Sequence, residues 1–310
     1  MGFISQLRYP TAWYSKLVIA ILSLAFFGLL AAAAISTYVV YRIVMPTRSH
    51  SEINLQDFPG HPESLAYVVA GEGPRDAWFF PGLKSAPTVV LCPGYQSSRG
   101  ELLPLAAALQ DHQYNVLLID FSAHGSSAGR STLGFQEVAE LRAAMNAVAE
   151  RGDVDADHFG LWGANLGAYV ALSEAAGDRR IRAVAVESPY GHPNDMAGVL
   201  VGKMGLGSFP LITGMVKLGF GWMNPLYRKV APLKLRMQSF QSVAQLYLES
   251  SDEPALAGTT RDLFQISPLP HELEVLAHGN YAGMLDDEKR NYENRIVSFF
   301  LVSLPPAGAQ

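Results

Sequence analysis

The chain has 310 residues, enough for one large domain or two average ones and for a sizeable hydrophobic core. With 49% apolar residues it is not a disordered chain, and its single cysteine, Cys92, excludes an internal disulfide and leaves the redox compartment open. The net charge of −5 argues against a nucleic-acid partner, because binding one requires cations that neutralise phosphates. Only 16% of the residues are charged, against about a quarter in typical domains, which suggests membrane contact as well as a core.

An apolar segment near the N-terminus predicts a membrane helix. Residues 17–41 are 25 residues without a charge, and at 1.5 Å per residue they exceed the roughly 30 Å thickness of the bilayer hydrocarbon. A cleaved signal peptide is the alternative, because the alanines at 31–34 resemble a cleavage site, but the stretch is too long for a signal peptide. We therefore predict an N-terminal segment and anchor at 1–45 and a single-pass membrane protein.

The orientation of this helix depends on few charges. Arg8 and Lys16 precede it, and Arg42 and Arg48 follow it, so that only the free amino terminus tips the balance. This favours a cytoplasmic N-terminus with the domain on the outer or periplasmic side. The expected partners are membrane lipid and other membrane-protein subunits that contact this helix.

After a predicted linker at 46–64, short β-rich runs alternate with helical stretches. This alternation implies right-handed crossovers and a mostly parallel sheet, which we place at 65–301, followed by a tail at 302–310. The predicted strands are 65–70, 77–80, 88–92, 116–120, 158–163, 182–187, 243–249 and 272–276, and the predicted helices are 101–110, 135–151, 166–176 and 287–301.

Ligands of such sheets bind beyond the carboxyl ends of the strands, so the loops after the strands are the places to search. Four of these loops carry informative residues. They read Pro93-Gly94-Tyr95-Gln96, Asp120 to Gly129 with His124-Gly125, Gly163-Ala164-Asn165-Leu166-Gly167, and Ser250-Ser251-Asp252.

In this order the elements resemble the α/β-hydrolase superfamily, and in particular serine hydrolases that carry a membrane anchor or act at membranes. The resemblance covers about residues 65–301. It implies an α/β-hydrolase fold with a cap over the site. It also implies an oxyanion hole formed by the N–H groups of Leu166 and of Tyr95 or Gln96.

The nucleophile position is where the chain departs from this family. The sharp turn requires a small-x-Ser-x-small pattern; Gly163 and Gly167 are present, but the centre is Asn165. A carboxamide has no hydroxyl or thiol to activate, so no acyl-enzyme can form on it. An introduced substitution of a natural serine would explain Asn165, but it would not explain a histidine lost as well.

The other two members of the triad are placed by the resemblance. Asp252 corresponds to the acid. Tyr281 corresponds to the base, and His278 is the alternative if the last strand ends one residue earlier. His124 is interpreted as a structural turn residue. The histidines lack metal-ligand spacing, so neither a metal site nor a cofactor is expected.

The segment 191–240 is predicted to form the cap. It holds eight glycines, five of the nine methionines, and six basic residues against Asp195 as its one acidic residue. Adaptable Met side chains beside cations suit an acyl chain, an anionic bilayer surface or a partner's membrane helix. A mobile lid that only faces the core is the alternative.

These observations predict a membrane-anchored protein with a hydrolase fold that is catalytically inactive. Its expected role is that of a binding or structural module, as a subunit of a membrane complex. The alternative is an active relative of the serine hydrolases, an esterase, lipase or acyl-peptide hydrolase that cleaves an ester or amide of an apolar substrate.

Overall fold

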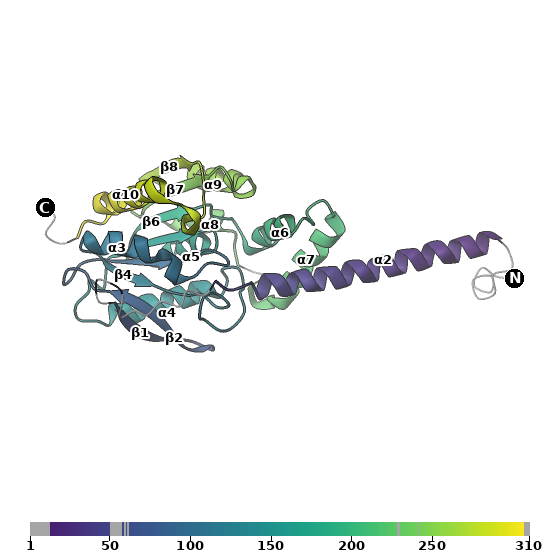
Figure 1. The fold of residues 1–310 in the computed structure, drawn as a ribbon, viewed down its shortest axis with the longest axis horizontal. Coiled ribbons are helices and arrows are strands. Elements are labelled where there is room, and N and C mark those ends of the chain that lie inside the picture. Colours follow the sequence, from purple (N-terminus) through teal and green to yellow (C-terminus); the bar gives the residue numbers. More distant parts are fainter. Residues whose placement is uncertain are drawn as a thin grey trace.

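The structure, a computed structural model, describes residues 13–49, 58, 60, 62–227, 230–240 and 242–306 (Figure 1). Within them lies one eight-stranded sheet of order β1-β2-β4-β3-β5-β6-β7-β8. The first two strands form an antiparallel hairpin, β2 pairs antiparallel with β4, and the remaining pairs are parallel, which confirms the mostly parallel sheet. The strands are β1 (Glu63–Val69), β2 (Gly73–Phe80), β3 (Thr88–Cys92), β4 (Asn115–Leu118), β5 (Phe159–Ala164), β6 (Ile181–Glu187), β7 (Ala244–Ser250) and β8 (His271–Leu276).

The central strands β3 and β5 are largely apolar because both faces of the sheet are covered. In β3 every residue is buried. Val89 and Leu91 contribute to one hydrophobic cluster and Val90 and Cys92 to the other, as the alternation of side chains along a strand requires. A strand buried on both faces therefore appears as a continuous apolar run, the pattern that located β3 in the sequence.

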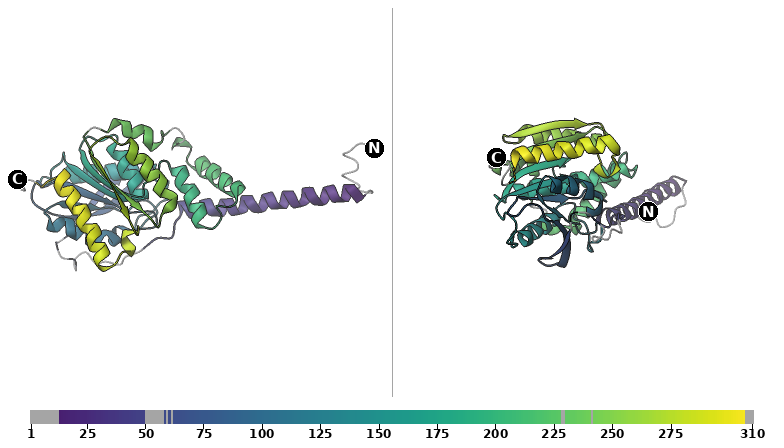
Figure 2. Two further views of the ribbon diagram at one scale, coloured as in Figure 1. Left: turned by 90° about the horizontal axis from the view of Figure 1, so that it is seen from above. Right: turned by 60° about the vertical axis from the view of Figure 1, so that its left-hand side comes forward.

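Helices form a layer on each face of the sheet (Figures 1 and 2). Residues of α4 (Glu137–Ala149), α5 (Leu166–Ala175) and α9 (Pro254–Ile266) pack in one cluster, and residues of α3 (Leu103–Asp111) and α10 (Asp286–Ser303) pack in the other. Helix α9 is not among the predicted helices, although its buried Leu256 and Leu263 have the seven-residue spacing of one helix face.

The chain between β6 and β7 forms the helices of the segment predicted to be the cap. These are α6 (Pro193–Lys203), α7 (Pro210–Met223) and the short α8 (Leu233–Arg236). Figure 1 shows α6 and α7 standing out from the sheet domain, with α7 beside the N-terminal helix.

The N-terminal helix α2 (Trp13–Val44) has 32 residues and extends beyond both ends of the predicted span. Most of it projects away from the domain (Figures 1 and 2), whereas its last turns enter the protein. Val39, Val40, Ile43 and Val44 are buried in the cluster that also holds the sheet residues on this face. The end of the apolar helix is therefore part of the domain core.

The predicted boundaries differ from the observed ones by a few residues. Strand β1 begins at Glu63, inside the predicted linker 46–64, and α10 ends at Ser303, inside the predicted tail 302–310. The rest of that linker and tail is described only at residues 46–49, 58, 60, 62 and 304–306. Residues 1–12 of the predicted N-terminal segment lie outside the described residues.

Replacing Phe300 by Ala tests the packing of α10 on the sheet. The Phe300 ring is fully buried in this interface, so its loss should lower the free energy of unfolding by about 3–5 kcal/mol. Val302 lies on the same helix but is 82% exposed, and Val302→Ala should change it by less than about 0.5 kcal/mol. Denaturant unfolding measures both; equal effects would contradict this packing.

Candidate active site

A sharp turn between β5 and α5, at residues 163–167, carries Asn165 at the carboxyl edge of the sheet. We call this turn the elbow. Asn165 has φ 34° and ψ −90°, a conformation rare for any residue with a side chain. A Cβ at Gly163 would lie 2.4 Å from the carbonyl carbon of Gly167, and one at Gly167 would lie 2.0 Å from the carbonyl oxygen of Cys92. Both glycines are therefore required by close backbone contacts, and they hold the turn that presents Asn165.

The carboxamide of Asn165 fills the predicted oxyanion hole. Its Oδ1 accepts hydrogen bonds from the backbone N–H of Tyr95, at 2.7 Å, and of Leu166, at 2.6 Å. In a serine hydrolase two such donors stabilise the oxyanion of the tetrahedral intermediate. The structure brings Tyr95 and Leu166 together at this point, whereas the hydrogen bonds of Asn165 do not involve Gln96, the other candidate. The donors are occupied by the protein's own side chain.

Tyr95 belongs to the loop at residues 93–96, which we call the oxyanion loop, and it also joins this loop to the end of α2. Its hydroxyl donates to the carbonyl oxygens of Ile43, at 2.9 Å, and Arg42, at 3.3 Å. The N–H of Ser131 donates to the carbonyl of Val44 at 2.8 Å. Because the last carbonyls of a helix lack partners within the helix, these contacts satisfy them and fix α2 beside the site.

The acid position is occupied by Asp252, which follows β7 and is exposed to solvent. Its Oδ1 accepts the backbone N–H of Gly279 at 2.7 Å. The carboxylate expected to orient a histidine thus holds the backbone of the loop that follows β8.

His278 and Tyr281, the two candidates for the base, each contact a carboxylate of α10. His278 is mostly exposed, and its Nδ1 lies 2.9 Å from Oε1 of Glu288 on α10. Tyr281 is buried, and its hydroxyl donates to Oε1 of Glu293 at 2.5 Å, while its ring packs on Trp162. Burial, together with Glu293, raises the pKa of Tyr281 above its ordinary value.

The backbone before Tyr281 accounts for this packing of the residue that the resemblance places at the base position. Asn280 has φ 61° and ψ 73°, a left-handed conformation that turns the chain before Tyr281. The ring therefore enters the cluster under α10, whereas the neighbouring Asn280 is exposed.

Glu187 is a buried residue of this site that the sequence reasoning missed. It ends β6, and Oε1 accepts the N–H of Asn280 at 2.9 Å while Oε2 accepts the hydroxyl of Tyr292 at 2.8 Å. Burial raises its pKa, and the nearby Asp252 carboxylate adds to this shift. A carboxylate that closes an otherwise apolar run was the signal available in the sequence.

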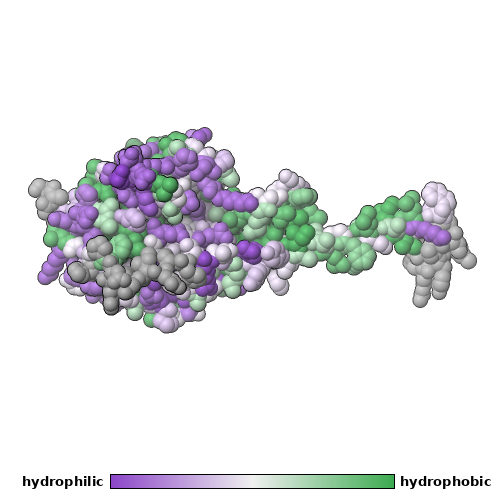
Figure 3. Space-filling model, in the orientation of Figure 1, coloured by the Kyte–Doolittle hydropathy of each residue, from purple (hydrophilic) through white to green (hydrophobic). Residues whose placement is uncertain are grey.

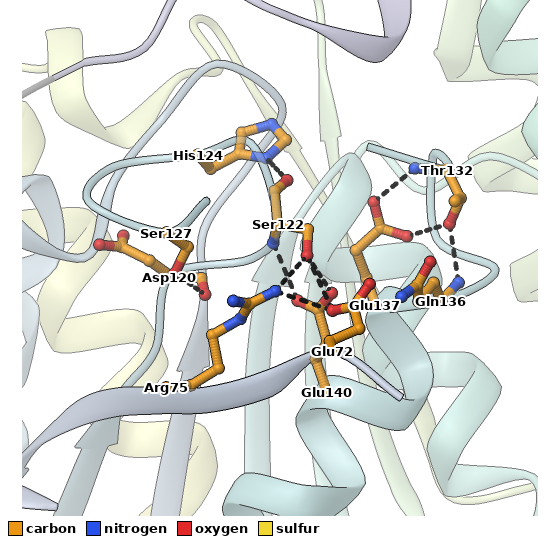
Figure 4. A network of polar contacts seen from close by, with 10 residues as sticks. All are labelled: Glu72, Arg75, Asp120, Ser122, His124, Ser127, Thr132, Gln136, Glu137 and Glu140. Atoms are coloured by element: carbon orange, nitrogen blue, oxygen red, sulfur yellow. Dashed lines mark hydrogen bonds and ion pairs between the residues drawn. The ribbon is translucent and has the colours of Figure 1, made fainter. Parts of the chain in front are cut away.

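Behind the oxyanion loop lies a network of buried polar side chains (Figure 4). The Nδ1 of His124 is 2.9 Å from the carbonyl oxygen of Ser122, and burial lowers the pKa of His124. Its ring packs edge-on against Tyr95. Ser122 donates to Glu140 through both its N–H, at 2.9 Å, and its hydroxyl, at 2.5 Å. The network thus supports the loop at residues 120–129, whose His124 packs against Tyr95.

No three His, Cys, Asp or Glu side chains among the described residues form a group that could hold a metal ion.

Comparison with known proteins defines the class. A sequence model of the alpha/beta hydrolase family matches residues 89–302, more than half of the chain, and the chain belongs to this family. An uncharacterized protein of Mycobacterium tuberculosis is 34% identical and a polyketide transferase of a Penicillium species is 31% identical, each over 116 residues. Each match covers 36% of this chain and 40% of the relative. The chain thus spans well under half the length of these curated relatives.

A longer but weaker match is to the uncharacterized protein YfhR of Escherichia coli, 22% identical over 257 residues, or 80% of this chain and 84% of that protein. Among solved structures, an esterase of Pyrococcus furiosus superposes with a TM-score of 0.66 at 18% identity and covers 84% of this chain and all of its own. At this identity the likeness concerns the fold alone.

Gly167→Ala tests the elbow. Its Cβ would meet the backbone of Cys92, which cannot move aside cheaply, so we expect a loss of about 3 kcal/mol in the free energy of unfolding. Gly258, on α9, has no atom within 4 Å of an added Cβ, and Gly258→Ala should instead stabilise by about 0.5–1 kcal/mol. Thermal and denaturant unfolding measure both; a Gly167→Ala protein as stable as the parent would refute the close contact.

Glu140→Gln tests the buried network. Burial and the neighbouring Glu137 raise the pKa of Glu140 to about 8, against an ordinary value of 4.5. Between these values the folded chain keeps a proton that the unfolded chain releases, so stability falls as pH rises. The glutamine variant, which cannot ionise, should lose this part of the decline between pH 5 and pH 8, measured as the urea midpoint at each pH. Parallel curves for the two proteins would contradict the assignment.

Proposed function

We propose that this member of the alpha/beta hydrolase family does not hydrolyse its ligand through a covalent ester and acts as a binding or structural module at a membrane. The observation that carries the proposal is the carboxamide oxygen of Asn165, bound by the N–H groups of Tyr95 and Leu166. A ground-state oxygen that holds both donors leaves none for a developing oxyanion. The imidazole of His278, committed to Glu288, offers no base beside it.

We further propose that α2 is a retained membrane anchor. Among the described residues it is the one helix long and apolar enough to cross a bilayer, and the hydropathy of its most apolar window averages 2.7. The helix continues without a break through the alanines at 31–34, and Ala32 belongs to the same buried cluster as Val39. A signal peptide that is removed would take this packed alanine with it or leave it at a new terminus.

Fluorophosphonate labelling and hydrolysis of short-chain nitrophenyl esters test the proposal on the full-length protein in detergent. The parent chain should show neither, because it has no hydroxyl at the elbow. Asn165→Ser supplies the hydroxyl and frees both N–H donors, and Asn165→Ala is the matched variant that frees the donors alone. We expect the serine variant to be no more reactive than the alanine variant, because the triad acts as a unit and its base is missing.

Labelling of the parent chain would overturn the proposal of inactivity. Turnover by Asn165→Ser above that of Asn165→Ala would show that a base reaches the elbow, and a further change of His278→Gln would then identify or exclude His278. A thermal unfolding curve for each variant ensures that only folded proteins are compared.

A further inference from the structure

An exposed apolar surface runs along α7 and the residues that flank it on either side. We call it the outer stripe, and its members are 54–86% exposed. They are Phe209, Leu211, Leu218, Trp222 and Leu226. Figure 3 shows hydrophobic side chains gathered over the cap helices where these helices meet α2. Exposed patches of this kind mark a surface that contacts a protein or a membrane.

The opposite face of α7 is already used inside the protein. Ile212, Val216 and Phe220 recur every four residues and are buried. Gly219 brings α7 close to α2, since a Cβ there would lie 3.3 Å from the Cγ2 of Val40. Helix α7 is thus apolar on both faces, whereas a surface helix of a soluble domain has a polar outer face.

The length of α2 places α7 at the level of the bilayer. Within the predicted span 17–41, no residue before Ala32 is buried, and burial recurs at Ser36 and Val39. Residues 17–31 are 15 residues that span only about 22 Å, while the hydrocarbon layer is about 30 Å thick and requires about 20 residues. The membrane span therefore continues into the part of α2 that is covered by the protein, beside the cap.

The charge of the cap is complementary to an anionic surface. No acidic residue occurs between Asp195 and Glu249, and Lys217 is the one charged residue of α7. Basic residues next to an apolar helix face attract anionic lipid headgroups. Trp222 is 76% exposed, and tryptophan is enriched at the membrane–water interface.

We propose that the outer stripe enters the lipid bilayer beside α2, in the leaflet nearest the domain, with Lys217 at the anionic headgroups. A bilayer fits this stripe better than a partner's membrane helix, because helices in membranes associate through small residues. Of the three glycines of α7, Gly219 faces α2, and the outer stripe itself consists of large side chains. The inference rests on the proposed anchoring by α2.

Site-directed spin labelling of the full-length protein in nanodiscs of phosphatidylcholine and phosphatidylglycerol tests it. Single cysteines replace Leu211 and Leu218 on the outer stripe, Leu24 in α2, and Leu269, which is 77% exposed in the turn before β8. The native Cys92 is fully buried, so the unsubstituted protein provides the background. Power saturation then compares collisions with oxygen, which concentrates in lipid, and with a water-soluble nickel chelate.

We expect Leu211→Cys and Leu24→Cys to favour oxygen and Leu269→Cys to favour nickel, with Leu218→Cys between them. If Leu24→Cys favours oxygen while both stripe positions behave like Leu269→Cys, the cap proposal fails and the anchor stands. If Leu24→Cys itself favours nickel, the anchor proposal fails. A stripe that is immobile and reached by neither reagent is covered by protein, which overturns the lipid assignment.

Discussion

The arrangement of the site depends on one acceptor, the Oδ1 of Asn165, which holds the N–H groups of Tyr95 and Leu166. The left-handed backbone at Asn165 costs about 1–3 kcal/mol, and two hydrogen bonds of about 1 kcal/mol each offset much of it. A serine enzyme keeps these donors for a charge that develops during the reaction. In this chain the Oδ1 of Asn165 satisfies both donors at rest, and it thereby joins the loop of Tyr95 to the turn between β5 and α5.

Tyr95 links these hydrogen bonds to the N-terminal helix α2. Its N–H serves the elbow, its hydroxyl serves the carbonyls of Arg42 and Ile43, and its ring packs on His124. The elbow, the oxyanion loop and the end of α2 therefore form one packed unit. A movement of α2 relative to the domain would have to break these contacts, which links the position of this helix to the geometry of the site.

The loop after β8 is held through its backbone N–H groups by carboxylates. Two carboxylates, Glu187 and Asp252, hold the successive N–H groups of Asn280 and Gly279. The backbone of the loop is thus bound where a serine hydrolase would use its acid to orient an imidazole. The tyrosine that follows joins α10 to the sheet through Glu293 and Trp162.

The sequence by itself determined the features that depend on near neighbours: the buried strands, the long apolar helix, the glycine pair of the elbow and Asn165 between them. These patterns arise from spacings of two to four residues, which the chain displays directly. Only the tertiary structure decided what those groups contact. The donor from Tyr95 lies 70 residues from Asn165, and that from Asn280 lies 93 residues from Glu187. The direction of Tyr281 was likewise decided by the backbone at Asn280, because a side chain points where the φ and ψ angles around it allow, and residue spacing does not encode those angles.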